Sequence, residues 1–139
     1  MSVLADIYVS TPENALAYDG SKEFPESERA ELTGFTYIEF STLWAIVEGK
    51  PWEEGHMDAF ESVMEDEKGE KMIFRFPDSF VELTVKLGDA AIESAAEEWA
   101  ETDELECDPE DLRPVIEELV RVAKVAKESG RGLYLWNSV

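Results

Sequence analysis

The segment 108–139 constrains the fold most, because it joins an amphipathic helix to a short apolar run. Apolar residues recur at the spacing i, i+3, i+4 and i+7, which is typical of a helix with one buried face. They are Leu112, Val115, Ile116, Leu119, Val122, Ala123 and Ala126. The pattern predicts a helix over 111–129, and Gly130 suits its left-handed C-cap.

Pro114 is expected in the first turn of this helix, because a proline in a helix interior removes a hydrogen bond and clashes with the preceding turn. After Gly130, the run Leu-Tyr-Leu-Trp at 133–136 predicts a strand over 132–137 that is apolar on both faces. We expect this strand to be central in a sheet, since an apolar edge strand would invite aggregation.

Length and composition indicate one domain covering residues 1–139. Hydrophobic residues make up 44% of the chain, which favours a packed core. No apolar run approaches the roughly 20 residues of a membrane span, and the start lacks the pattern of a signal peptide. Cys107 is the one cysteine, so no internal disulfide is expected. The simple interpretation is a cytoplasmic protein of bacterial type.

The rest of the chain predicts an α+β fold: a single domain with a small mixed sheet of about four strands and about five helices packed on it. Further strands are expected over 2–9, 34–40 and 71–76, and further helices over 41–49, 57–64, 78–87 and 89–101. Ser41 is the expected N-cap of the helix predicted over 41–49. Turn-forming residues dominate 10–30, which predicts a long loop.

Charge is the extreme property of the composition. There are 33 acidic residues against 12 basic ones, for a formal net charge of −21. Such a chain should repel nucleic acid and anionic membranes, so neither is expected as a partner. The simple interpretation is a solvated surface. A basic protein partner, mimicry of nucleic acid and a salt-rich habitat are the alternatives.

One acidic run between residues 97 and 111 contains no base. Its nine acids are Glu97, Glu98, Glu101, Asp103, Glu104, Glu106, Asp108, Glu110 and Asp111. A solvated helix end followed by a loop would explain it, and so would a docking patch for a basic protein or a weak site for a divalent cation. The first six of these residues are candidate binding residues.

Trp44 and Trp52 are the other candidate binding residues, because they could line an aromatic pocket. The alternative is that both fill space in the core, each with one polar partner.

Residues with chemical potential are few. His56 lies among acids, but the sequence holds no metal-binding motif with the required spacing, so a surface or structural histidine is expected. Cys107 stands between two acids, which oppose thiolate formation and make a nucleophilic role unexpected. No catalytic residue, metal or cofactor is therefore predicted.

Two stretches resemble the YfbM-like family of uncharacterised bacterial proteins. One is 43–52, a short helix that ends in Gly49 and leaves through Pro51-Trp52; the other is the closing helix with 130–136. The resemblance implies a small α+β domain and carries over no catalytic residue.

Two hypotheses for function follow from these observations. The first is a non-catalytic interaction protein, immunity-like or regulatory, that engages a basic protein through its acidic surface. The alternative is a small enzyme or ligand-binding domain with an aromatic-lined pocket. The sequence leaves the oligomeric state open.

Overall fold

The computed structural model describes residues 4–15, 26–102 and 108–138. In sequence order, the elements within these residues are β1 (Leu4–Ser10), η2 (Glu26–Glu28), β2 (Arg29–Thr33), α1 (Tyr37–Glu48), α2 (Glu54–Asp58), β3 (Glu61–Glu65), β4 (Lys71–Arg75), α3 (Asp78–Val85), α4 (Asp89–Ala100), α5 (Pro109–Ser129) and β5 (Gly132–Ser138). The predicted α+β class is confirmed.

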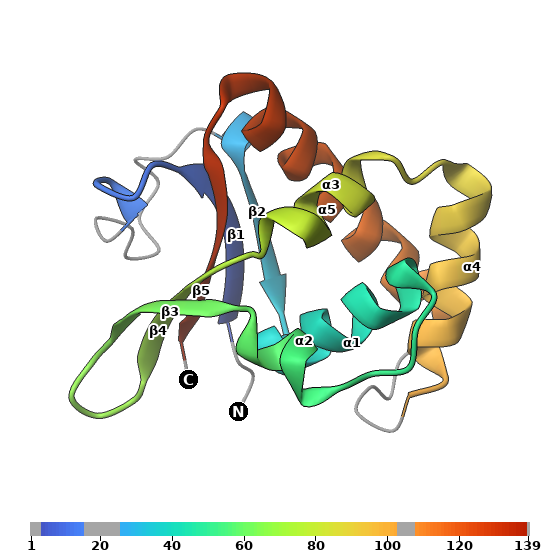
Figure 1. The fold of residues 1–139 in the computed structure, drawn as a ribbon, viewed down its shortest axis with the longest axis horizontal. Helices are drawn as coiled ribbons and strands as arrows, with labels where there is room; N and C mark the ends of the chain where they lie inside the picture. Colours follow the sequence, from blue (N-terminus) through green and yellow to red (C-terminus); the bar gives the residue numbers. More distant parts are fainter. Residues whose placement is uncertain (1–3, 16–25, 103–107, 139) are drawn as a thin grey trace.

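The strands form one sheet in the order β2-β1-β5-β4-β3 (Figure 1). β5 is its central strand, as predicted, and pairs with β1 along its whole length, from Leu4 with Ser138 to Ser10 with Gly132. The prediction that the sheet is mixed is wrong, because every neighbouring pair of the described strands is antiparallel. About four strands were expected, and the described sheet has five.

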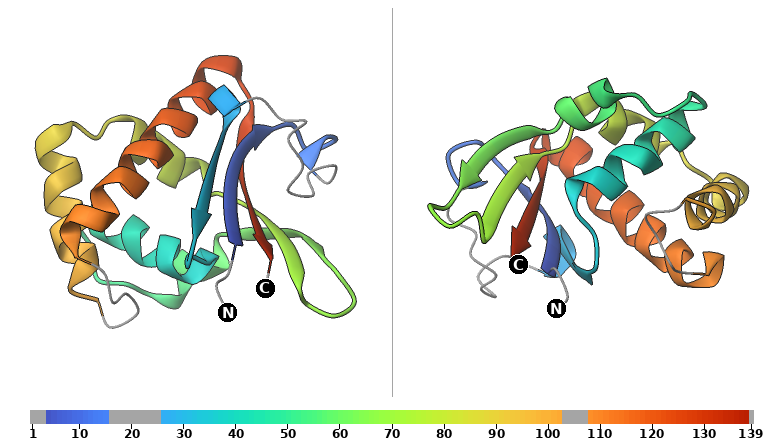
Figure 2. Two further views of the ribbon diagram at one scale, coloured as in Figure 1. Left: turned by 180° about the vertical axis from the view of Figure 1, so that it is seen from behind. Right: turned by 90° about the horizontal axis from the view of Figure 1, so that it is seen from below.

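The helices lie on one side of the sheet, as Figure 2 shows from two directions. α5 lies against this face, where it contacts β1, β2 and β5, and α3 and α4 pack against α5. Leu133 and Leu135 of β5 belong to the core beneath the helices, whereas Tyr134 and Trp136 belong to a smaller cluster with Tyr8. Both faces of β5 are therefore buried, which explains its continuous apolar sequence.

Pro114 departs from its predicted place. α5 begins at Pro109 instead of near residue 111, so Pro114 lies inside the helix and not in its first turn. A proline at the first helical position has its backbone already set for the helix, which is why Pro109 opens α5. Pro114 is exposed, and its missing hydrogen bond falls on the solvent side of the helix.

The strand predicted over 34–40 is wrong, and so is Ser41 as a helix N-cap. Gly34 has a φ of 85°, and the Thr36 side chain accepts a hydrogen bond from the backbone of Ile38, so α1 begins at Tyr37. Ser41 lies inside α1, where its hydroxyl donates to the carbonyl of Ile38 at 2.6 Å. The alternation of polar and apolar residues before Ser41 concealed the capping threonine.

The long loop predicted over 10–30 overlaps the start of β2 at Arg29, and no strand is predicted for Arg29–Thr33. Residues 16–25 of the predicted loop lie outside the described residues. β2 is an edge strand that pairs with β1 alone among the described strands. Its sequence Arg-Ala-Glu-Leu-Thr has two charges in five positions, which is common at a sheet edge and hides a strand from pattern reading.

The helix predicted over 57–64 is also wrong. These residues contain the end of α2 and then β3, which pairs with β4 as a hairpin. The register shifts between Ser62 and Met64, and Val63 and Met64 both pack against the smaller cluster. Two consecutive apolar residues on one face are unusual in a regular strand, so the bulge made this segment resemble a helix.

The first prediction tests the buried face of α5. Leu119 is 1% exposed within the core, so Leu119→Ala should lower the free energy of unfolding by roughly 2–5 kcal/mol through the cavity that it leaves. Denaturant titration measures this loss. A loss below about 0.5 kcal/mol would contradict the assignment of this face as buried.

Candidate functional site

A cavity of about 270 Å³ lies where the second half of α1 meets α2. It is lined by Trp44, Glu48, Lys50, Pro51, Glu53, Gly55 and His56. The left-handed cap at Gly49, with a φ of 76°, ends α1 and turns the chain back past the cavity. Of the two predicted aromatic residues, Trp44 lines this cavity and Trp52 is not among its lining residues.

His56 is buried in the cavity wall and links α1 to α2. Its Nδ1 accepts a hydrogen bond from the backbone N–H of Glu53 at 3.0 Å, and its Nε2 lies 2.9 Å from Glu48 Oε1. Because Nδ1 must offer a lone pair to accept, the ring proton belongs on Nε2, which donates to the Glu48 carboxylate. Both ring nitrogens are thus occupied, which suits a structural role and leaves no lone pair for a general base.

Trp44 is 9% exposed, and its ring meets the His56 ring edge-on at 4.9 Å. Its indole nitrogen is buried and has no hydrogen-bond partner among the described residues. A buried donor without a partner costs about 1–3 kcal/mol. Among the described buried side-chain atoms that line the cavity, this nitrogen is the one without a partner. It is a point where an added acceptor would stabilise the protein.

Trp52 has a different environment. Its side chain is 42% exposed, and its indole N–H donates to the Ser41 hydroxyl at 3.0 Å. Ser41 is fully buried in α1, so the tryptophan lies across the outside of that helix. The prediction that each tryptophan has one polar partner therefore holds for Trp52 and not for Trp44.

The described acids of the predicted run lie at the end of α4 and the start of α5, and Glu93 of α4 adds another acid. Together they form what we call the α4–α5 acidic surface, whose seven side chains are all exposed: Glu93, Glu97, Glu98, Glu101, Asp108, Glu110 and Asp111. α4 and α5 pack against each other (Figure 1), which brings their carboxylates onto one region of the molecule. Asp103, Glu104, Glu106 and Cys107 lie outside the described residues.

Arg113 is the one basic residue in the sequence between positions 89 and 120. Its guanidinium lies 3.9 Å from Glu93 and 3.6 Å from Glu117. One guanidinium offsets one negative charge, whereas the α4–α5 acidic surface carries seven carboxylates. The α4–α5 acidic surface thus retains most of its charge.

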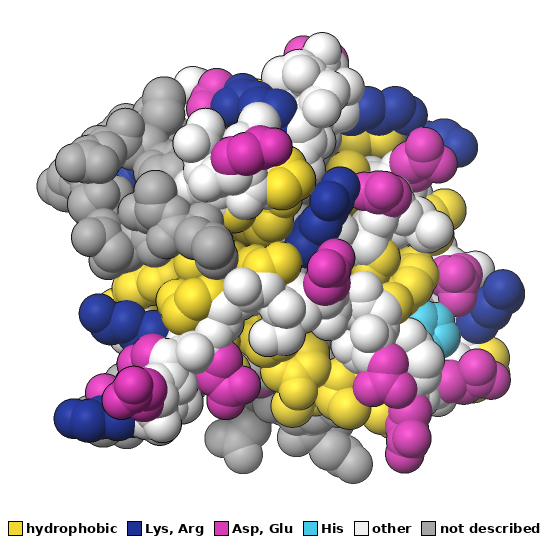
Figure 3. Space-filling model, turned by 60° about the vertical axis from the view of Figure 1, so that its left-hand side comes forward, with side chains coloured by type: hydrophobic (Ala, Val, Ile, Leu, Met, Phe, Trp, Pro, Cys, Tyr) yellow, Lys and Arg dark blue, Asp and Glu magenta, His cyan; other side chains and the backbone are white. Residues whose placement is uncertain are grey.

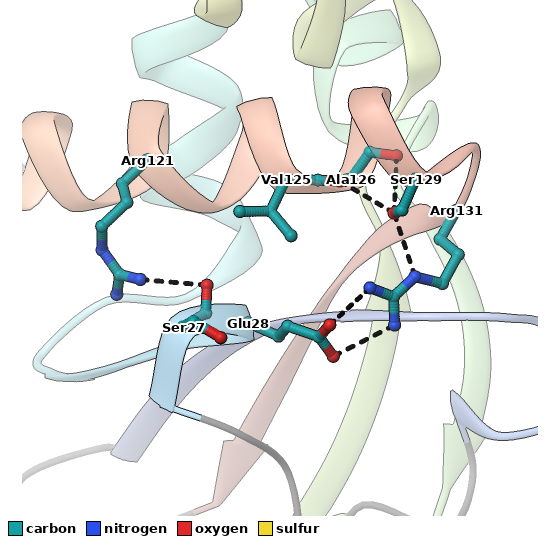
Figure 4. Close-up of polar contacts among 7 residues, drawn as sticks. All are labelled: Ser27, Glu28, Arg121, Val125, Ala126, Ser129 and Arg131. Carbon is teal, nitrogen blue, oxygen red and sulfur yellow. Dashed lines mark hydrogen bonds and ion pairs between the residues drawn. The ribbon is translucent and has the colours of Figure 1, made fainter.

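A larger cavity, of about 430 Å³, lies between β2 and α5 and is lined by Arg121 and Glu118. Arg121 donates to the carbonyl oxygen of Ser27 at 3.2 Å (Figure 4) and to that of Arg29 at 2.7 Å. Arg121 also donates to Glu118, three positions earlier in α5, at 2.9 Å, a spacing at which side chains of one helix meet. Its bonds to the backbone around β2 carry no sequence signal, because they join residues more than ninety positions apart.

Arg131 and Glu28 form a second link between the same regions. Two guanidinium nitrogens bind the two carboxylate oxygens at 3.1 Å and 2.6 Å, and Ser129 accepts a third bond from Arg131 at 3.0 Å (Figure 4). The hydrogen bonds from Arg131 hold the pKa of Glu28 below its ordinary value, and Glu28 in turn raises the pKa of Arg131. This paired geometry fastens η2 to the end of α5.

Within the residues that the structure describes, no group of three or more histidine, cysteine, aspartate or glutamate side chains is placed to hold a metal ion. In the same residues, every helix is too short or too polar to cross a membrane.

Comparison with protein-family models gives no match, and comparisons with curated proteins and with solved structures also give none. The resemblance to the YfbM-like family stays a prediction. In the structure its two stretches form the second half of α1 with its exit, and α5 with most of β5.

The second prediction concerns the pH dependence of the Glu28–Arg131 pair. The pKa of Glu28 is lower in the folded protein than in the unfolded chain. The pair therefore stabilises the fold fully above the unfolded-state pKa of Glu28, and this stabilisation is lost as the pH falls through the folded-state pKa. Glu28→Gln should therefore destabilise by roughly 1 kcal/mol at pH 7 and by less under acidic conditions.

Chemical denaturation of both proteins between pH 7 and pH 3 measures this difference. Glu67→Gln, at an exposed position in the turn between β3 and β4, is the matched control. A difference for Glu28→Gln that stays constant with pH would show that the carboxylate is not paired in solution.

Proposed function

We propose that the protein is a non-catalytic interaction domain, regulatory or immunity-like, that engages a basic protein partner. The observation that supports this most is the α4–α5 acidic surface, where seven exposed carboxylates are accompanied by Arg113 as the one base. Charge of one sign concentrated on one surface steers an oppositely charged partner and aligns it on approach.

The distribution of charge distinguishes this proposal from a surface that is acidic for solubility alone. Charges selected for solubility work from any exposed position, whereas a binding surface depends on where they lie. Opposite charges interact over about 8 Å at physiological salt, so carboxylates on another part of the molecule cannot substitute for those at the contact. Position is therefore the property to test.

The third prediction compares two variants that each lose three negative charges. Glu97, Glu98 and Glu101, all exposed on α4, are changed to Gln in one; Glu65, Glu67 and Glu70, all exposed on the β3–β4 hairpin, are changed to Gln in the other. A fluorescent oligolysine peptide should bind the α4 variant several-fold more weakly than the hairpin variant at low salt. Fluorescence anisotropy at low salt and at about 0.15 M salt measures both affinities.

Equal weakening in the two variants would mean that net charge alone attracts the peptide, and the proposal would then fail. Binding that does not weaken with salt would argue equally against an electrostatic contact.

A second candidate function is the binding of a small polar ligand in the cavity beside Trp44. The uncompensated indole N–H favours it, because a ligand acceptor there would relieve the cost of that buried donor. Glu48 and Glu53 outnumber Lys50 among the charged lining residues, which favours an amine that also carries an acceptor, such as an amino alcohol. The nitrogen is shielded from solvent, so the ligand would have to displace a lining side chain.

The fourth prediction follows from this second candidate. Titration with ethanolamine at millimolar concentrations should shift the indole N–H signal of Trp44 in nuclear magnetic resonance spectra and leave that of Trp52 in place. Trp44→Phe removes the signal and so assigns it. The smaller ring leaves a cavity in the core and should lower stability, so a thermal melt checks that this variant is folded. A Trp44 signal that stays unmoved would remove this candidate for amino alcohols.

A further inference from the structure

Three large hydrophobic side chains are exposed among the described residues: Leu4 at 45%, Ile38 at 38% and Trp52 at 42%. Two of them are neighbours. The Trp52 indole donates to the Ser41 hydroxyl, which itself donates to the carbonyl of Ile38. Trp52 is thereby tied to the turn of α1 that bears Ile38, and we call these two exposed side chains the apolar patch. A space-filling view of one face of the molecule shows hydrophobic side chains that reach the surface between carboxylates (Figure 3).

The patch is held in place before any partner arrives. Ser41 is fully buried, so its hydroxyl is a fixed point to which the Trp52 ring is tied at 3.0 Å. Pro51 restricts the backbone immediately before the tryptophan. A side chain that is already ordered loses little conformational entropy on binding, and tryptophan is the residue type most enriched where truncation costs affinity.

Carboxylates lie next to both residues of the patch in the sequence. Glu53 and Glu54 follow Trp52 directly and are exposed, and Glu39 follows Ile38. Lys50 is the one base near Trp52 in the sequence. The indole N–H of Trp99 donates to the carbonyl of Glu39 at 3.2 Å, so the first turn of α1 lies against the last turns of α4, which carry the α4–α5 acidic surface.

We propose that Trp52 and Ile38 are the apolar anchor of the interface with the basic partner, and that the segment docking there carries a large apolar side chain among its lysines or arginines. The inference rests on the proposed function and adds the chemistry of the partner. The apolar side chain covers the Trp52 ring, while the bases face Glu53, Glu54 and the acids of α4. An apolar centre with a charged rim is the usual arrangement of a specific interface.

Charge decides against the other occupants of such a patch. A second copy of this chain brings another net charge of −21 to the contact, and like charges opposed across an interface cost affinity. An anionic membrane repels the surrounding carboxylates for the same reason. A basic segment has the complementary sign.

The fifth prediction uses two labelled helical peptides of equal length and charge. One carries lysines with leucines along one face; in the other, serines replace the leucines. The wild-type protein should bind the lysine–leucine peptide more tightly than the lysine–serine peptide. Trp52→Ala should lower the affinity for the lysine–leucine peptide at least about fivefold and leave the affinity for the lysine–serine peptide unchanged. Fluorescence anisotropy measures all affinities.

Three further variants serve as controls. Leu4→Ala removes an equally exposed hydrophobic side chain from β1 and should leave both affinities unchanged. Ile38→Ala should weaken the lysine–leucine peptide in the same direction as Trp52→Ala. Trp52→Phe keeps an aromatic ring without the bond to Ser41, so it should lose less affinity for the lysine–leucine peptide than Trp52→Ala loses. If a thermal melt shows that Trp52→Ala is unfolded, Trp52→Phe tests the anchor in its place.

The outcomes separate this inference from the function on which it rests. If the two peptides bind the wild-type protein equally and in a salt-dependent manner, the interaction with bases stands and the anchor is overturned. The anchor is also overturned if Trp52→Ala leaves the affinity for the lysine–leucine peptide unchanged, or if Leu4→Ala lowers it as much. If the wild-type protein binds neither peptide at low salt, the proposed function fails, and the anchor fails with it.

Discussion

The fold depends on the insertion of β5 between β1 and β4, two strands made much earlier in the chain. Without β5, the pair β2–β1 would not be joined to the pair β4–β3 in the described sheet, and α5 would have no continuous surface to cover. Asn137, fully buried in β5, also donates its amide to the carbonyls of Leu4 at 3.2 Å and Phe35 at 2.9 Å. The segment before α1 is thereby fixed to the central strand, so the position of α1 and of its surface residues follows from this one long-range pairing.

The elements predicted well are those whose signals are local. The spacing of its apolar residues predicts α5, and Gly130 predicts where the helix ends. Gly130 has a φ of 69°, as expected for a left-handed C-cap. β5 was predicted to be central because its apolar residues alternate between two faces that both need cover. For α3 and α4, the periodicity placed the helices to within two residues of the observed ends. In each case a few neighbouring residues determine the structure.

The segments predicted wrongly are those whose secondary structure depends on a single residue or on a partner that is remote in the sequence. Thr36 turns an alternating sequence into the start of α1, and the bulge at Val63 gives β3 a helical appearance. For the candidate site, the sequence indicates which aromatic residues could line a pocket, Trp44 among them, but not their contacts. The contact of His56 with Glu48 and the hydrogen bonds from Arg121 to the backbone near β2 arise from tertiary packing. No pattern within one segment encodes them.

The central position of β5 also has a consequence for the chain during its synthesis. β1 and β4 leave the ribosome well before β5, and until then each lacks the neighbour that covers it in the folded sheet. Strands with unpaired edges and apolar faces are the species that aggregate. A chain with 33 acids and 12 bases repels its copies even while unfolded. The carboxylates that we propose for contact with a basic partner therefore also keep nascent chains apart until β5 has been synthesised.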